Sequence, residues 1–115
     1  MNAEEMKHRT RGFALEIARF TLMLPDNLPN SVYKRQLVRA SSSVGANYRA
    51  SRRAKSKADF INKLKIVEEE LDESLFFLEL IGALNENYKE RINILYQEGD
   101  VLLRIIVSSI LSARK

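Results

Sequence analysis

Four segments with apolar residues at helical spacing, and very few residues that break helices, predict an all-α fold. The chain of 115 residues contains 4 Gly and 2 Pro, and both prolines, Pro25 and Pro29, fall in one short segment. No segment alternates apolar and polar residues as a half-buried strand does. We therefore predict one domain, residues 1–115, folded as an antiparallel up-down four-helix bundle.

The first helix is predicted over residues 3–24, because Phe13, Ile17, Phe20 and Leu24 recur in a 4-3-4 pattern. The proline-containing segment 25–30 is predicted to be the first loop. We expect Asn30 or Ser31 to cap the second helix, since a short side-chain oxygen can satisfy a free backbone N–H.

The second helix is predicted over residues 32–51, with its apolar and basic residues on opposite faces. One face carries Tyr33, Leu37, Ala40, Val44, Tyr48 and Ser51. The opposite face carries Arg35, Arg39, Ser42, Ala46 and Arg49. We expect the tyrosines in the core and the arginines outside it. The run of small residues 40–47, which includes Gly45, predicts the close approach of another helix.

The third helix is predicted to begin after Ser56, because Ser56 and Asp59 have the spacing of a capping box. It should end near residues 82–84, where a short turn at residues 85–87 leads to a fourth helix over residues 88–113. Both helices are apolar over more than one stripe. Such helices are central to a bundle or are buried in a second interface.

The charges are segregated along the chain. Residues 33–65 contain ten Lys and Arg and one acid, Asp59, whereas residues 68–100 contain ten acids and only Lys89 and Arg91. This pattern indicates a basic surface for a polyanion, or head-to-tail pairing between copies of the chain. The alternative is that both blocks are solvated helix faces.

No catalytic, cofactor or metal motif is present, and we expect a protein without enzymatic activity. The acid run 68–73 lacks the Glu-x-x-His motif of di-iron bundles, and the one histidine, His8, has no motif that places a nucleophile beside it. The chain has no cysteine, no secretory signal and no apolar run near the ~20 residues of a membrane span. These features predict a cytoplasmic protein that does not contact membranes.

The cations left outside the core have the chemistry to neutralise a phosphate backbone. We predict that RNA or DNA binds, with little sequence preference, to Arg35, Arg39, Arg49, Arg52, Arg53, Lys55 and Lys57.

Three segments together resemble a known family. They are Tyr33-x-x-x-Leu37, Arg39-Ala40-Ser41-x-Ser43-Val44-x-x-Asn47 and Ser56-x-x-Asp59-Phe60, and residues 66–75 resemble the same family's third helix. The family is the small bacterial four-helix-bundle family, also called ribosomal-RNA intervening-sequence proteins. The resemblance implies a ring-shaped homo-oligomer, typically a pentamer, and a nucleic-acid role.

Related bundle proteins accompany reverse transcriptases, so the resemblance also leaves open a structural oligomer or adaptor for a polymerase-type partner. The chain departs from the family after Asn47. The family commonly continues Ile-Ala-Glu-Gly, whereas this chain has Tyr48-Arg49-Ala50-Ser51. The loss of an acid and the gain of Arg49 make this end of the helix more basic, which favours a polyanion partner.

Overall fold

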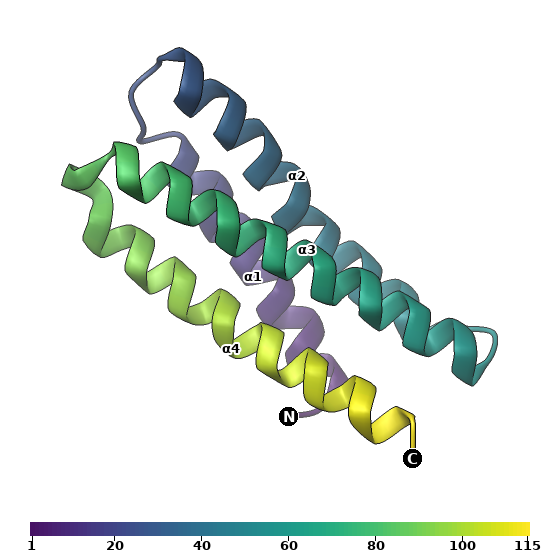
Figure 1. Cartoon of the computed structure of the whole chain (residues 1–115). Coiled ribbons are helices and arrows are strands. Elements are labelled where there is room, and N and C mark those ends of the chain that lie inside the picture. The colour runs from purple at the N-terminus through teal and green to yellow at the C-terminus, as the bar shows by residue number, and fades with distance from the viewer.

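Four long α-helices make up the computed structural model, which describes residues 1–115 and contains no strand (Figure 1). The helices are α1 (Ala3–Thr21), α2 (Leu28–Ser51), α3 (Lys57–Leu84) and α4 (Lys89–Ala113), and a single 3-10 turn, η1 (Glu86–Tyr88), leads into α4. The predicted all-α class and the predicted number of helices are confirmed.

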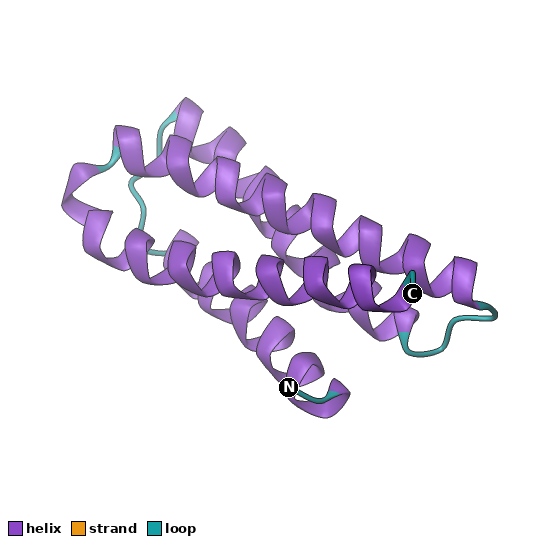
Figure 2. Cartoon of the chain, turned by 60° about the horizontal axis from the view of Figure 1, so that its bottom comes forward, coloured by secondary structure: helices purple, strands orange, loops and turns teal.

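The helices form an elongated body measuring 45 × 21 × 19 Å. Helix α2 packs along α3, α3 packs along α4, and α1 packs mainly on α2. The α1–α2 loop and the α3–α4 turn lie at one end of the body, and the α2–α3 turn and the C-terminus lie at the other (Figure 1). In Figure 2 the N-terminal half of α1 diverges from the other three helices.

Two ion pairs bridge the seam between α1 and α4. Arg9 donates two hydrogen bonds to the Glu98 carboxylate, at 2.9 and 2.6 Å, and the hydrogen bond to Glu98 raises the pKa of the Arg9 guanidinium. About two helical turns further along α1, Arg91 of α4 donates to Glu16 at 2.8 Å. The seam is therefore held by charge-assisted hydrogen bonds as well as by apolar packing.

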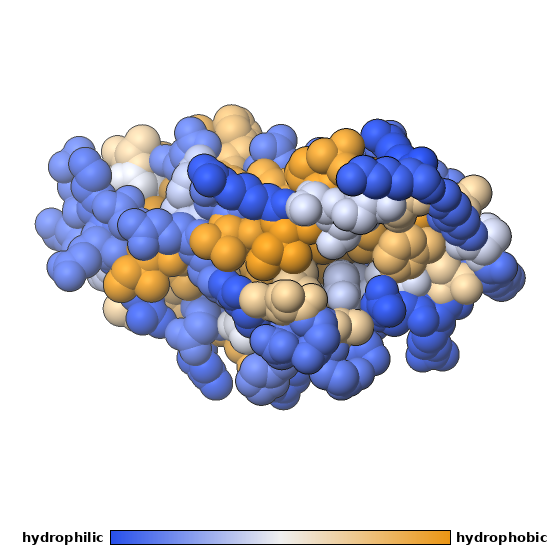
Figure 3. Space-filling view, turned by 90° about the horizontal axis from the view of Figure 1, so that it is seen from below, coloured by the Kyte–Doolittle hydropathy of each residue, from blue (hydrophilic) through white to orange (hydrophobic).

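Each helix buries one face in a common core. The core residues are Met6, Phe13, Ile17, Phe20, Leu24, Leu37, Val44, Tyr48, Leu64, Val67, Leu71, Leu75, Leu78, Ile81, Ile92, Leu95, Leu102, Ile106 and Ile110. Other apolar side chains remain outside: Figure 3 shows hydrophobic atoms across the middle of the face seen from below, the side on which α4 lies in Figure 1. The exposed apolar residues of α4 are Ile94, Val101 and Leu111.

The division of α2 into two faces is confirmed. Leu37, Ala40, Val44, Tyr48 and Ser51 are buried, and Tyr33 is half-buried beside Phe77, with 6.1 Å between the ring centroids. Arg35, Arg39, Ser42, Ala46 and Arg49 are exposed. The helical period of the sequence is sufficient to place these side chains.

The predicted boundary between the first two helices is wrong. Helix α1 ends at Thr21, and α2 begins at Leu28, capped by Asn27, whose side chain accepts a hydrogen bond from the Asn30 N–H at 2.9 Å. Pro29 lies in the first turn of α2, where a proline costs nothing because the N–H it lacks would have no helical partner. Asn30 is not a cap: it is buried inside the helix.

Ser56 caps the start of α3, as predicted. The Ser56 side chain accepts a hydrogen bond from the Asp59 N–H at 3.1 Å. The Asp59 carboxylate reaches back one residue further than in a capping box and accepts from the Lys55 N–H at 3.1 Å. Asp59 thereby ties the α2–α3 turn to the first turn of α3.

Candidate nucleic-acid interface

A basic concavity lies where α2 ends and α3 begins. Arg52 caps the C-terminus of α2, and the chain continues in tight turns in which the Arg53 N–H donates to the Ala50 carbonyl at 3.1 Å. The concavity that these turns help to shape has a volume of about 660 Å³. Its lining residues are Ala46, Arg49, Ala50, Arg53, Lys55, Ser56, Asp59 and Lys63.

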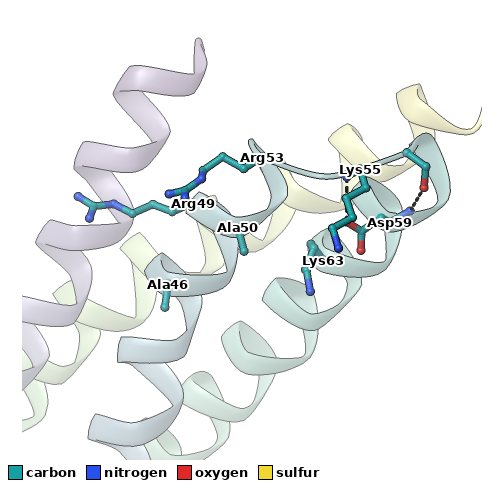
Figure 4. Close-up of a pocket in the computed structure, with 8 residues that line it drawn as sticks. Ala46, Arg49, Ala50, Arg53, Lys55, Asp59 and Lys63 are labelled. Atoms are coloured by element: carbon teal, nitrogen blue, oxygen red, sulfur yellow. Dashed lines mark hydrogen bonds between the residues drawn. The ribbon is translucent and has the colours of Figure 1, made fainter.

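The charged lining residues form two groups, one on each side of the concavity (Figure 4). Arg49 and Arg53 come from the end of α2, and the Arg49 side chain extends towards α1. Lys55, Asp59 and Lys63 come from the turn and from the first two turns of α3. Asp59 and Lys63 share a face of α3 because they are four residues apart.

Positive charge in the concavity is not balanced within the chain. None of the ion pairs in the structure involves Arg49, Arg53, Lys55 or Lys63. The one acid, Asp59, uses a carboxylate oxygen to accept from the backbone of the turn. Four cations that line one hollow create a positive potential that favours an anionic ligand.

The structure brings only some of the predicted binding residues together. It brings Arg49, Arg53 and Lys55 together in the concavity. Arg39 instead pairs with two acids of α3, Glu70 at 2.9 Å and Glu73. Its charge is therefore offset within the chain, although half of the side chain remains exposed.

Arg52 and Lys57 lie near the concavity, at the same end of the bundle, and Arg35 lies nearer the start of α2. The Arg52 guanidinium sits 5.6 Å from the centroid of the Phe60 ring, at cation–π distance. Lys57 donates to the carbonyl of Lys115 at 3.4 Å, so the C-terminus lies at the same end of the body. Arg35 is exposed more than three turns before Arg49. A continuous basic stripe along α2 is thus interrupted at Arg39.

Sequence reasoning missed Lys63 as a member of this group. The available signal was its position four residues after Asp59, within the basic block 33–65. Because that spacing places both side chains on one face of α3, the capping prediction at Ser56 and Asp59 could have identified it.

The lining of the concavity suits phosphate groups better than bases. It contains no aromatic residue, so there is no platform on which a base could stack. Tyr48, which neighbours Arg49 in sequence, is 6% exposed, and burial raises the pKa of its phenol. The tyrosine lies in the core, as its place on the apolar face of α2 predicts.

No group of three or more His, Asp or Glu side chains is arranged to hold a metal ion. No helix combines the length and apolar character that crossing a membrane requires.

Comparison with known proteins places the chain in a family. Residues 4–108 match the family model described as 23S rRNA-intervening sequence protein. The fold is similar to the crystal structure of a protein of unknown function from the S23 ribosomal protein family of Bacteroides thetaiotaomicron, with 29% sequence identity and a TM-score of 0.86. That match covers 96% of this chain and 98% of the other. No match was found among curated proteins. Because the family model spans nearly the whole chain, this protein belongs to the 23S rRNA-intervening sequence protein family.

Proposed function

We propose that this protein is a non-catalytic binder of RNA or DNA, which it holds by the phosphate backbone in the basic concavity between α2 and α3. The observation that carries the proposal is the set of four cations without ion-pair partners, Arg49, Arg53, Lys55 and Lys63, around one hollow. Binding would release counterions from the nucleic acid, so the affinity should depend steeply on salt and little on sequence. The family description, which refers to 23S rRNA, supports a nucleic-acid ligand.

Reversing two charges in the concavity should weaken this binding. We expect R53E/K63E to bind a generic single-stranded RNA at least about tenfold more weakly than the wild type at ~50 mM salt, because two phosphate contacts become repulsive. The slope of log affinity against log salt should fall by about 1.4, which corresponds to two phosphate contacts on a single strand. Fluorescence anisotropy over a salt titration measures both quantities.

A double charge reversal on α4 provides a matched control. Lys89 and Arg104 are exposed and lie outside the concavity, so K89E/R104E changes the net charge by the same amount. This variant should retain most of the affinity and the wild-type salt slope. Equal weakening in both variants would mean that only the overall charge matters, and unchanged binding by R53E/K63E would refute the proposed site.

A second function, as a structural oligomer, is favoured by two complementary edges of the bundle. We propose that the chain is an antiparallel up-down bundle that joins neighbouring copies head to tail. The groove between α1 and α2 is basic and lined by small residues: Lys7, Arg11, Ala14, Leu15, Ser42, Gly45, Ala46 and Arg49. The edge between α3 and α4 is acidic: Glu69, Asp72, Glu73, Leu75, Phe76, Glu79 and Tyr96.

These two edges lie on opposite sides of the body, because α2 and α3 pack on each other between them. Phe76 projects from the acidic edge with half of its surface exposed, while the basic groove offers Gly45 and Ala46. A contact between two different surfaces of the same chain is heterologous, and it closes into a ring if the rotation permits. A ring, as a pentamer would be, would also repeat Arg53, Lys55 and Lys63, which lie outside the groove, and so raise the avidity for a polyanion.

A charge-swap series tests this assembly. K7E/R11E and E69K/D72K should each reduce the oligomer mass, since each variant meets a neighbour with like charge. The quadruple variant K7E/R11E/E69K/D72K restores opposite charges across the contact and should recover the wild-type mass. Light scattering coupled to gel filtration measures the masses. A quadruple variant that remains dissociated, or double variants that remain assembled, would show that these edges do not meet.

A further inference from the structure

One end of the bundle presents large apolar side chains to solvent. We call this surface the apolar end; it lies where the α1–α2 loop and the α3–α4 turn come together (Figure 1). Its residues and their exposed fractions are Leu22 (86%), Met23 (52%), Leu28 (78%), Val32 (41%) and Leu84 (58%). Connecting segments on a protein surface are usually polar, so an end that carries three exposed leucines requires an explanation.

The backbone of the apolar end is firmly held. The N–H groups of Leu22 and Met23 donate to the carbonyls of Arg19 and Phe20 at 3.2 and 2.9 Å. The side chains of Asn30 and Asn85 donate to each other at 2.9 and 2.8 Å and so join the start of α2 to the end of α3. The same loop buries Leu24, which is 5% exposed, while its neighbours Leu22 and Met23 point outward. Leu22 and Met23 are therefore exposed on an ordered loop, and Leu28 and Leu84 on the ends of helices.

The charges around the apolar end are balanced, whereas those at the opposite end are not. Residues 19–34 and 84–90 together contain three cations, Arg19, Lys34 and Lys89, and three acids, Asp26, Glu86 and Glu90. The opposite end contains Arg52, Arg53, Lys55, Lys57, Arg114 and Lys115 against Asp59. Two copies can thus meet at the apolar end without repulsion, and their like-charged basic ends would then lie far apart.

The area of the apolar end is sufficient for a contact between two copies. The exposed fractions of the five residues correspond to roughly 600 Å², the upper limit for an apolar patch on a typical monomer. Two such surfaces placed face to face would bury roughly 1,200 Å², the lower limit for a stable specific interface. A neutral surface of this size, with charges of both signs around it, fits a second copy of itself.

We propose that two copies of this chain associate end to end through the apolar end, with Leu22 and Leu28 of each copy packed against the partner. The contact is isologous, because the same surface is used on both sides, and it leaves both basic concavities free. It is independent of the proposed function and of the head-to-tail contact, which uses the long edges of the bundle. In a ring built through those edges, it would pair two rings face to face.

Removing the apolar character of this end tests the proposal. We expect L22S/L28S to have half the wild-type mass in sedimentation velocity across a micromolar concentration series, and the same helicity by circular dichroism because both side chains are exposed. L111S, which removes an exposed leucine near the opposite end, should keep the wild-type mass. Equal masses for L22S/L28S and the wild type at every concentration would overturn the proposal.

A cross-linking experiment then identifies which ends meet. Because the chain has no cysteine, L22C and L111C each carry a single thiol. A flexible bis-maleimide should join L22C into dimers and leave L111C mainly monomeric on a denaturing gel. Cross-linking of L111C but not L22C would contradict end-to-end contact. The K7E/R11E variant, which addresses only the head-to-tail contact, should retain the L22C cross-link, so the two assemblies can fail separately.

Discussion

Replacing Asn85 with alanine should lower the free energy of unfolding by about 1–3 kcal/mol, because it leaves the buried amide of Asn30 without its partner. Asn30 is 1% exposed and Asn85 is 9% exposed. Each amide donates to the other, and Asn85 also donates to the Ile81 carbonyl at 2.8 Å. The substitution would leave the Asn30 side-chain carbonyl buried with no donor. Urea denaturation of the purified variant measures the loss.

A double-mutant cycle separates the amide pair from the rest of the effect. N30A and N85A should each be destabilising, and N30A/N85A should cost less than the sum of the two, because the second substitution removes a group that was already unpaired. N87A is the matched control: Asn87 is exposed in the same turn, and its substitution should change stability by less than about 0.5 kcal/mol. Additive losses in the cycle would show that the two amides do not depend on each other.

The amide pair also explains why Asn30 was wrongly predicted as a cap of α2. Locally, Asn30 follows a proline and precedes Ser31, which is typical of a helix start. Its actual partner, Asn85, is 55 residues away, and no local pattern reveals that contact. The cap lies three residues earlier, at Asn27, and Pro29 is a first-turn proline instead of a loop proline.

The rest of the fold could be predicted from the sequence, because helical periodicity determines where each side chain lies around its own helix axis. Leu37 and Val44 are fully buried, and Arg35 and Arg49 are exposed, as the wheel of α2 predicts. What periodicity does not report is the rotation and register of one helix against another. The contact between Arg39 and Glu73 depends on how α2 and α3 pack, so the interruption of the basic stripe could not be predicted.

The candidate site, too, was predictable where it depends on position along one helix and unpredictable where it depends on contacts between helices. Arg49, Arg53 and Lys55 were predicted from their position near the end of a basic helix, and the structure does bring them together. Lys57 is drawn towards the C-terminus and Arg52 towards Phe60, through contacts that involve other helices or the turn. Binding of nucleic acid by these residues stays a prediction. We now expect the binding site to be the concavity, with Lys63 as a further binding residue.

Glycine substitutions should change stability in opposite directions along this chain. The small-residue run predicts the close approach of another helix, and Gly45 does face Thr10 of α1. A Cβ atom at Gly45 would lie 3.6 Å from the Thr10 Oγ1, which is an ordinary contact. At Gly99 a Cβ atom would lie 2.8 Å from the Leu75 Cδ2 and 3.1 Å from the Phe13 Cζ. The glycine at which an added Cβ atom would clash is therefore Gly99 of α4, which packs against side chains of α3 and α1.

We expect G99A to lower the free energy of unfolding by about 1–3 kcal/mol, because the added methyl group displaces two side chains of a packed core. This loss should exceed the helix-propensity gain of up to about 1 kcal/mol from removing a glycine. At Gly12 a Cβ atom would meet nothing within 4 Å, so G12A should show that gain alone, about 0.5–1 kcal/mol of added stability. Both values can be measured by urea denaturation.

The contrast between the two variants isolates the packing effect, since both remove a mid-helix glycine and add one methyl group. G45A, with its ordinary contact to Thr10, should resemble G12A and not G99A. If G99A were as stable as G12A, Leu75 and Phe13 would have to shift at almost no cost, and the junction of α1, α3 and α4 would be loosely packed. A clear loss at Gly99 alone would locate the tightest constraint on this bundle in α4, outside the small-residue run of α2.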